Sequence, residues 1–293
     1  MSYDLFFTEP KITLQQFEDY FADRDNYKVE KTQAWYANED TGVYFSFDYE
    51  DEPDEDPEAP SFIVSFNLNY YRPHVFALEA EPEIQAFVNQ FGFKIHDPQA
   101  EGMGDGPYST EGFIRGWNQG NEFGYSSIMT QAVPDAIHTR PKEELEAIWT
   151  WNFARKNIQN TFGENVFVPK IMYMKINDKI QSFAIWPDAI PTLIPQVDVL
   201  VIPRQELAPR RLFRKKGDMC IVPSDIALPI LKSFKSDEYP MPAYLLSYAS
   251  PPTDVSAFVK SLKPYVKKIE GVAMDQVLNR ELIEKAQGNL TVH

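Results

Sequence analysis

Carboxylate side chains gather in one short stretch of the sequence. Between Asp48 and Glu58, eight of the eleven residues are acidic, and two more are Pro53 and Pro57. Charges this dense repel one another and cannot be buried without a large cost in free energy. The stretch is therefore either a solvated loop or a surface that a cationic partner covers. The acidic residues are Asp48, Glu50, Asp51, Glu52, Asp54, Glu55, Asp56 and Glu58.

A hairpin rich in aromatic residues precedes this acidic stretch. Asn38–Gly42 is polar and ends in glycine, which suits a turn that needs one residue at positive φ. In the strand that follows, alternation places Val43, Phe45, Phe47 and Tyr49 on one face and Tyr44, Ser46 and Asp48 on the other. The first strand contains Trp35. We therefore predict aromatic side chains close to the acidic stretch, with Trp35, Tyr44 and Tyr49 as candidate anchors for a partner.

One basic cluster follows a predicted strand that ends near Pro203. Its candidate anion-binding residues are Arg204, Arg210, Arg211, Arg214 and Lys215, with Lys216 beside them and only Glu206 opposing. It can be a solvated loop, an anion or nucleotide site, or a partner of the acidic stretch within one molecule or between two copies. Exposed ion pairs of that kind contribute about 0–1 kcal/mol each.

The chain offers no recognisable catalytic or metal-binding pattern. Its four histidines lie far apart, and none has a second His or Cys at the spacing of metal ligands. Cys220 lies in a buried-strand context, and neither a Gly-x-Ser-x-Gly nor a His-Glu-x-x-His motif occurs. We expect no metal, no cofactor and no catalytic residue. A repeat of glycine at every fourth position, Gly112, Gly116, Gly120 and Gly124, predicts either close helix packing or a substrate groove.

The charge is spread unevenly along the chain. The formal net charge is −15, and residues 1–108 carry 23 Asp and Glu against 6 Lys and Arg, whereas residues 109–293 carry 20 against 22. The first part would repel a phosphate backbone, so we expect no nucleic acid there and a basic protein instead. The lone cysteine, the absence of a long apolar run and the absence of a basic leader predict a cytoplasmic protein without a membrane span.

The order of the predicted elements indicates an α+β fold. Strands are expected at 3–8, 27–30, 32–37, 43–49, 61–71 and 93–96, with helices from Leu14 to Arg24, behind a capping box at Thr13, and over 81–91. Helices over 109–129 and 142–161 follow, then a hairpin turning at Asn177 and Asp178, further strands, and helices at 224–233, 253–262 and 274–287. We predict two lobes, each an antiparallel sheet with helices packed on one side: residues 1–100 and 164–293, joined by a Gly-rich loop and two helices at 101–163.

In its overall type the chain resembles bacterial immunity proteins of contact-dependent or secreted toxin systems. The residues that carry this resemblance are the acidic stretch Asp48–Glu58 and the aromatic hairpin Trp35–Tyr49. The resemblance implies a protein that neutralises a cognate toxin by covering its active site, with the acidic stretch against a basic surface of that toxin. Two other functions remain open: an enzyme or ligand-binding protein with an anion or nucleotide site between the lobes, or a scaffold that forms homodimers or larger oligomers.

Overall fold

The computed structural model describes residues 1–50, 62–131, 137–209 and 217–290 of the chain. The chain divides into two compact units: unit 1 consists of residues 1–142 and 275–293, and unit 2 consists of residues 143–274. Unit 2 is therefore inserted into the sequence of unit 1. This division differs from the predicted three parts, because residues 101–142 and the carboxyl-terminal segment both belong to unit 1.

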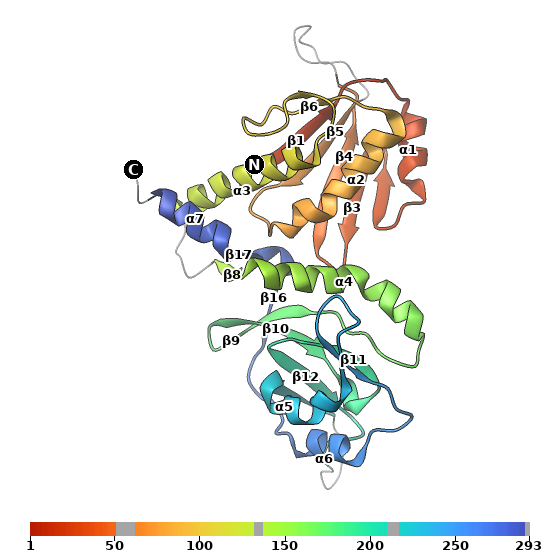
Figure 1. Ribbon diagram of the computed structural model, residues 1–293, viewed down its shortest axis with the longest axis vertical. Helices are drawn as coiled ribbons and strands as arrows, with labels where there is room; N and C mark the ends of the chain where they lie inside the picture. Colours follow the sequence, from red (N-terminus) through yellow and green to blue (C-terminus); the bar gives the residue numbers. More distant parts are fainter. Residues whose placement is uncertain (51–61, 132–136, 210–216, 291–293) are drawn as a thin grey trace. The chain divides into compact units, whose positions relative to one another are not determined.

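Unit 1 is built on an antiparallel sheet of seven strands, in the order β2-β3-β4-β5-β1-β6-β7. The strands are β1 (Ser2–Phe7), β2 (Tyr27–Glu30), β3 (Gln33–Asn38), β4 (Val43–Tyr49), β5 (Val64–Asn69), β6 (Ile95–His96) and β7 (Asp105–Gly106). The helices α1 (Leu14–Ala22), α2 (Val75–Phe91) and α3 (Thr110–Gln131) lie on one face of this sheet (Figure 1). The predicted α+β fold is confirmed.

Aromatic side chains fill the core between the sheet and these helices. The ring of Phe87 on α2 lies 5.1 Å from Phe47 and 5.1 Å from Phe7, and 5.4 Å from Phe21 on α1. Burying one such ring contributes about 1.5–3 kcal/mol. The predicted capping box is also present, since the Gln16 amide donates to the Thr13 hydroxyl at 3.2 Å and the Thr13 amide donates to Gln16 Oε1 at 2.9 Å. The alternation along the strands places the aromatic rings on the face of the sheet that the helices cover.

The predicted start of α2 is wrong by six residues. The sequence predicts a helix from Glu81 because Ile84, Phe87 and Val88 recur on one helical face. In the structure α2 begins at Val75 and Pro82 lies inside it. Proline removes one backbone hydrogen bond there. Phe76, Ala77 and Ala80 in the first turns are buried in the core of unit 1, however, and this packing stabilises the helix.

The glycines of α3 allow close packing. A Cβ built on Gly120 would lie 2.2 Å from the Tyr70 hydroxyl oxygen, and one on Gly116 would lie 2.8 Å from the Tyr3 hydroxyl oxygen. A Cβ on Gly124 would lie 2.9 Å from the Tyr71 ring. The helix therefore rests on tyrosine side chains that leave no room for a larger residue. These contacts agree with close helix packing, the first of the two predicted explanations of the repeat, and Gly116 and Gly120 also line a pocket.

The carboxyl-terminal segment completes unit 1. Strand β17 (Val277–Asn279) pairs in parallel with β8 (His138–Arg140), and α7 (Arg280–Leu290) packs on α3 in a cluster with Tyr125, Leu278, Ile283 and Ala286. The predicted helix over 274–287 is therefore wrong at its start. The 3₁₀ turn η4 (Met274–Gln276) and β17 replace it, because pairing with β8 satisfies the backbone there.

Unit 2 begins with α4 (Lys142–Phe162, in unit 2 from Glu143) and contains two sheets. One has the order β13-β12-β10-β9-β16, formed by β9 (Met172–Ile176), β10 (Lys179–Ile185), β12 (Val199–Arg204), β13 (Asp218–Pro223) and β16 (Glu270–Val272). The other has the order β11-β15-β14, formed by β11 (Thr192–Pro195), β14 (Lys235–Ser236) and β15 (Ala243–Leu246). The remaining elements are η2 (Pro187–Ala189), α5 (Ser224–Leu231), η3 (Lys232–Phe234) and α6 (Thr253–Ser261).

The larger sheet of unit 2 is mixed rather than purely antiparallel as predicted. The hairpin of β9 and β10 turns at Asn177 and Asp178, whose φ angles of 49° and 60° match the predicted turn. Strand β12, however, runs parallel to β10, with Phe183 opposite Val199. The chain between them first crosses to the smaller sheet as β11, and this crossover returns it in the same direction.

Candidate binding surface

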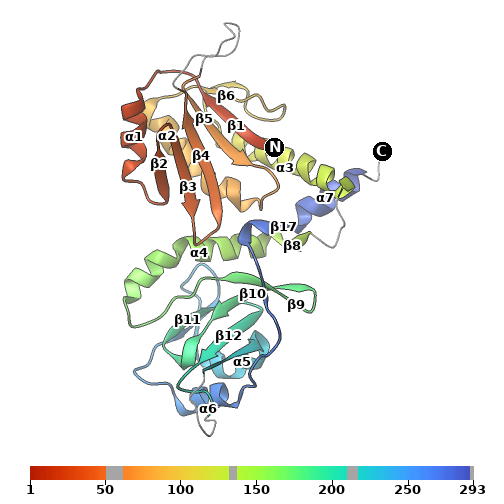
Figure 2. The ribbon, with the colours of Figure 1, turned by 180° about the vertical axis from the view of Figure 1, so that it is seen from behind.

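Four neighbouring strands of unit 1 present polar and aromatic side chains on the sheet face opposite the helices. In the view of Figure 2 these strands lie in front of α1 and α2. The register places Trp35 beside Ser46, Ser46 beside Asn67, and Asn67 beside Asp4. We name this surface the open sheet face and define it by Ser2, Asp4, Phe6, Gln33, Trp35, Tyr44, Ser46, Asp48, Ser65 and Asn67.

An aromatic pair stands on this face. Trp35 is 40% exposed, and its ring stacks on Tyr44 at a centroid distance of 5.7 Å and an interplanar angle of 22°. Tyr44 is fixed in turn, because its hydroxyl accepts a hydrogen bond of 2.6 Å from Arg72 Nε and donates one of 3.4 Å to Asp275. A large aromatic side chain held in one position loses little conformational entropy on binding, which favours its use as an anchor.

Two carboxylates lie on the same face, Asp48 on β4 and Asp4 two strands away on β1. Asp48 accepts hydrogen bonds from Gln33 Nε2 at 2.6 Å and from the Ser46 hydroxyl at 2.8 Å, whereas Asp4 accepts one from Asn67 Nδ2 at 2.5 Å. These donors are neutral, so they hold the carboxylates in place without cancelling their charge. Two cations adjoin these residues: Lys28 lies opposite Trp35 and pairs with Glu30, and Arg72 donates to the Tyr44 hydroxyl. The described residues of the open sheet face thus combine an exposed aromatic ring with fixed carboxylates, and the two cations lie at its border.

The structure separates the predicted anchors. Trp35, Tyr44 and Asp48 share the open sheet face, but Tyr49 turns to the other side, where its hydroxyl donates to the Ile12 carbonyl at 3.2 Å and its ring lies 5.8 Å from Phe17. Glu50 is exposed at the end of β4. The other predicted residues, Asp51, Glu52, Asp54, Glu55, Asp56 and Glu58, lie outside the described residues.

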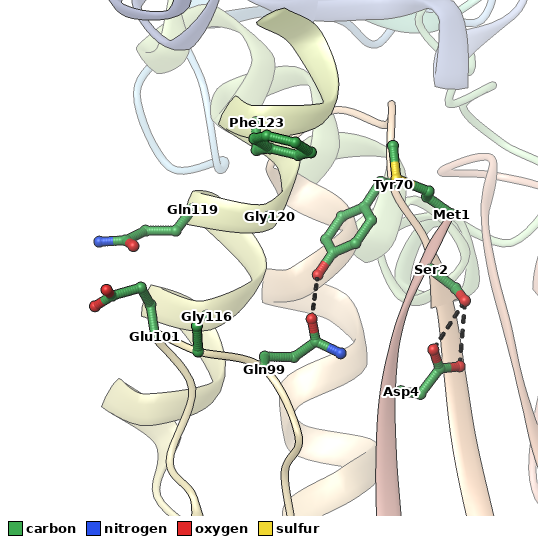
Figure 3. Close-up of a pocket in the computed structure, with 11 residues that line it drawn as sticks. Met1, Ser2, Asp4, Tyr70, Gln99, Glu101, Gly116, Gln119, Gly120 and Phe123 are labelled. Atoms are coloured by element: carbon green, nitrogen blue, oxygen red, sulfur yellow. Dashed lines mark hydrogen bonds between the residues drawn. The ribbon is translucent and has the colours of Figure 1, made fainter. Parts of the chain in front are cut away.

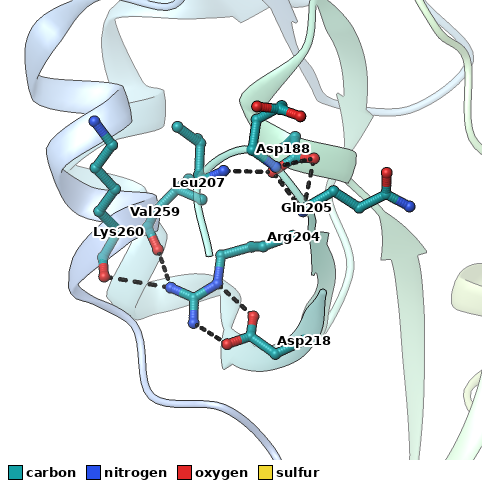
Figure 4. Close-up of polar contacts among 8 residues, drawn as sticks. Asp188, Arg204, Gln205, Leu207, Asp218, Val259 and Lys260 are labelled. Carbon is teal, nitrogen blue, oxygen red and sulfur yellow. Dashed lines mark hydrogen bonds and ion pairs between the residues drawn. The ribbon is translucent and has the colours of Figure 1, made fainter. Parts of the chain in front are cut away.

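Arg204, the first residue of the predicted anion site, is part of the interior of unit 2 (Figure 4). It is fully buried and forms a bidentate pair with Asp218, at 2.8 Å for Nε and 2.9 Å for Nη2. Its Nη1 donates to the Val259 carbonyl at 2.7 Å. Every nitrogen of this guanidinium thus has an acceptor inside the fold. The other predicted residues, Arg210, Arg211, Arg214 and Lys215, lie outside the described residues.

A carboxylate also occupies the backbone donors next to Arg204. Asp188, at a φ of 46°, accepts hydrogen bonds from the Gln205 amide at 2.8 Å, the Glu206 amide at 3.2 Å and the Leu207 amide at 3.1 Å. Successive amides of this kind form an anion-binding concavity. Here the anion is a side chain of the same unit, as Figure 4 shows, so these described donors are already used.

A pocket of about 670 Å³ lies in unit 1 between α3, the start of β1 and residues 99–101 (Figure 3). Its polar lining includes Asp4, Gln99, Glu101 and Gln119, and among the residues that the structure describes no Lys, Arg or His lines it. The lining also contains Gly116, Gly120 and Tyr70, and two exposed apolar side chains at the rim, Met1 at 65% and Phe123 at 67%. The Tyr70 hydroxyl donates to Gln99 Oε1 at 3.2 Å.

Sequence reasoning missed Asp4 and Glu101 as surface carboxylates that share a pocket. A signal for Asp4 exists, because Ser2, Asp4 and Phe6 alternate with the buried Tyr3, Leu5 and Phe7 along β1. Nothing in the sequence links Asp4 to Glu101. The loop that carries Glu101 reaches the pocket because Asp97 accepts hydrogen bonds from the Tyr3 hydroxyl at 2.6 Å and from the Met103 amide at 2.8 Å. In Figure 3 the two carboxylates lie on opposite sides of the pocket.

The described residues show no metal centre. Among them, no group of three or more His, Cys, Asp or Glu side chains is placed to hold a metal ion. Cys220 is buried, and burial raises the pKa of its thiol. No helix within the described ranges has the length and apolar character needed to span a membrane.

Comparison of the chain with protein-family models, with curated proteins and with solved structures gave no match.

Proposed function

We propose that this protein is a non-catalytic binding protein that neutralises a basic protein partner, in the manner of a cytoplasmic immunity protein acting on a toxin, and that the open sheet face of unit 1 receives this partner. The observation that carries the proposal is the exposed Trp35, stacked on Tyr44 and placed on the same face as the carboxylates of Asp4 and Asp48. An aromatic anchor within a negatively charged surface suits a partner with a positively charged one.

The charge of the two units supports this assignment. Residues 1–142 and 275–293 carry 29 Asp and Glu against 11 Lys and Arg, whereas residues 143–274 carry 14 against 17. The excess negative charge therefore belongs to the unit that bears the open sheet face. Such a field accelerates the approach of a basic protein and repels nucleic acid. The alternative function, an anion or nucleotide site around Arg204, has less support. In its described part, Asp218 and Asp188 already accept the hydrogen bonds of the donors.

The experiment is affinity capture from a lysate of the native host at low salt, followed by binding measurements on the purified captured protein. We compare the wild type with Trp35→Ala and Asp48→Asn. Asp178→Asn is the matched control, because Asp178 is a 95% exposed carboxylate of unit 2 at positive φ, where asparagine is tolerated. We expect Trp35→Ala to weaken binding by about thirtyfold or more, the effect of losing a hot spot, and the control to bind as the wild type.

An inhibition assay completes the test. The captured protein should be basic, should arrest cell growth when expressed alone, and should be tolerated when the wild-type chain is co-expressed. Binding that is insensitive to both Trp35→Ala and Asp48→Asn would show that another surface is used. Failure to obtain a basic protein whose activity the chain suppresses would overturn the proposed function itself.

A further inference from the structure

Strand β1 has an unpaired edge beside the pocket of unit 1. On one side β1 pairs with β5 along its whole length, from Ser2 opposite Asn69 to Phe7 opposite Val64. On the other side β6 covers only Phe6 and Phe7. The chain turns away after His96, because Asp97 is held by Tyr3 and by the Met103 amide. We name the resulting gap, bordered by Ser2–Asp4 and residues 99–101, the β1 notch.

The backbone groups of Ser2 and Asp4 point into this notch. The Tyr70 amide donates to the Met1 carbonyl at 3.2 Å, which makes Met1 and, by alternation, Tyr3 and Leu5 the residues that hydrogen-bond to β5. Ser2 and Asp4 therefore direct their amides and carbonyls the other way. Within the described ranges, no backbone partner reaches them. An unpaired strand edge is a template for a further strand.

The walls of the notch suit an extended peptide. The pocket of about 670 Å³ adjoins the free edge, and the glycine face of α3 at Gly116 and Gly120 forms its far wall (Figure 3). Met1 and Phe123 supply exposed apolar surface at the rim. An added strand would direct alternate side chains to opposite sides. One set would meet the apolar rim and α3, and the other would lie on the open sheet face beside Asp4.

The charge of the notch favours a basic residue in the added strand. Cross-strand neighbours share a face, so the side chain opposite Asp4 would lie next to its carboxylate. Glu101 adds a second carboxylate to the lining, on the side of the pocket away from Asp4 (Figure 3). The nearby Arg115 does not line the pocket, and its guanidinium donates to the carbonyls of Glu101 at 3.0 Å and Gly102 at 2.7 Å.

We propose that the β1 notch binds an extended segment of the basic partner as an additional strand, which continues the line of β6 and places an Arg or Lys side chain opposite Asp4. This inference rests on the proposed function and assigns part of the partner's contact to main-chain hydrogen bonds. In such strand addition the backbone contributes the affinity and the alternate side chains contribute the specificity.

The test uses the full chain, labelled for NMR, and the peptide acetyl-Thr-Val-Arg-Val-Thr-amide as probe. We expect hydrogen exchange of the Asp4 amide to slow by about tenfold when the peptide is bound. A peptide with Glu in place of Arg should bind about threefold more weakly. Ala100→Trp, which adds bulk at an exposed position of the lining, should abolish binding, whereas Ala100→Ser should preserve it.

The outcomes separate this inference from the proposed function. No peptide binding, or binding without protection of the Asp4 amide, would overturn strand addition. Protection that appears without peptide and rises with protein concentration would identify a second copy as the occupant and also overturn it. If the captured basic protein binds through Trp35 but leaves the Asp4 amide unprotected and tolerates Ala100→Trp, this inference fails and the proposed function stands.

Discussion

The ring of Tyr70 occupies the space that a side chain at Gly120 would need: a Cβ on Gly120 would lie 2.2 Å from the Tyr70 hydroxyl oxygen and 2.3 Å from its Cζ. Tyr70 also stacks on the fully buried Trp117 at 5.3 Å and donates to Gln99. This contact joins α3, the end of β5 and the loop of the pocket, so the glycine determines how closely three parts of unit 1 approach one another.

We therefore predict that Gly120→Ala destabilises unit 1. Alanine is favoured over glycine inside a helix by about 1 kcal/mol, but the added methyl group must displace Tyr70, and overpacking of this kind costs about 1–3 kcal/mol. The urea midpoint should fall. Gly288→Ala in α7 is the matched control, because no described atom outside the neighbouring residues and its own helix backbone lies within 4 Å of its Cβ position, and its midpoint should stay level or rise. A Gly120→Ala protein as stable as the wild type would contradict the packing described.

Glu79 anchors the tip of the hairpin of β3 and β4. Its Oε1 accepts hydrogen bonds from the hydroxyl of Tyr36 at 2.7 Å, from Asn38 Nδ2 at 2.8 Å and from the hydroxyl of Thr41 at 3.0 Å. Glu79→Leu would leave these buried donors without their acceptor, at a cost of about 1–3 kcal/mol each. We predict a loss of at least about 3 kcal/mol in the free energy of unfolding, measured by chemical denaturation.

Two controls sharpen this prediction. Glu79→Gln keeps an acceptor oxygen and should lose less stability than Glu79→Leu. Glu9 pairs with Lys94 on the surface at 2.9 Å, and Glu9→Leu should change stability little. Equal losses of unfolding free energy for Glu79→Leu and Glu9→Leu would show that the buried hydrogen bonds of Glu79 contribute no more than an exposed ion pair.

The pair of Arg204 and Asp218 can be tested by a double-mutant cycle. Breaking a buried pair by removing one partner costs about 3–5 kcal/mol, whereas replacing both partners by apolar residues is often far less harmful. We predict that Arg204→Met strongly destabilises unit 2 and that adding Asp218→Leu recovers part of the loss. Losses that add independently in the double variant would show that the pair is not coupled.

Buried tyrosines should make the protein sensitive to alkali. Burial raises the pKa of Tyr248 to about 12, while its hydroxyl donates to the Ala189 carbonyl at 2.6 Å. In the unfolded chain a tyrosine ionises near pH 10. The neutral phenol is thus favoured by the folded state, and the stability it contributes is complete below about pH 10 and is lost as the pH rises towards 12.

The measurement is the urea midpoint between about pH 9 and about pH 11. The wild type should lose stability steeply over this range, because burial also raises the pKa of Tyr20, Tyr27, Tyr36 and Tyr125. The urea midpoint of Tyr248→Phe should fall less between these two pH values than that of the wild type, because the variant lacks one ionising group. An unchanged slope would mean that Tyr248 ionises equally well in both states.

Local chemistry made much of unit 1 predictable. The capping box at Thr13, the hairpin turn at Asn38–Gly42 and the alternation of Val43–Tyr49 each depend on residues close in sequence, and all three occur in the structure. The predicted hairpin turn also placed the strand of Trp35 beside the strand of Asp48, as the structure has them. Solvation and backbone geometry act over a few residues, so a single stretch carries the information.

Other features of the fold depend on residues that are distant in the sequence, and only the tertiary structure shows them. Val277 and Leu278 form a strand rather than a helix because β8, some 140 residues earlier, offers a parallel partner. From the sequence, Arg204 is predicted to be a surface cation. In the structure it is buried, where it donates hydrogen bonds to Asp218 and to the carbonyl of Val259. Asp4 and Glu101 share a pocket only because Tyr3 and Met103 both bind Asp97. The composition and spacing of residues determine which helices and strands can form. Long-range hydrogen bonds and packing determine which of these elements contact one another.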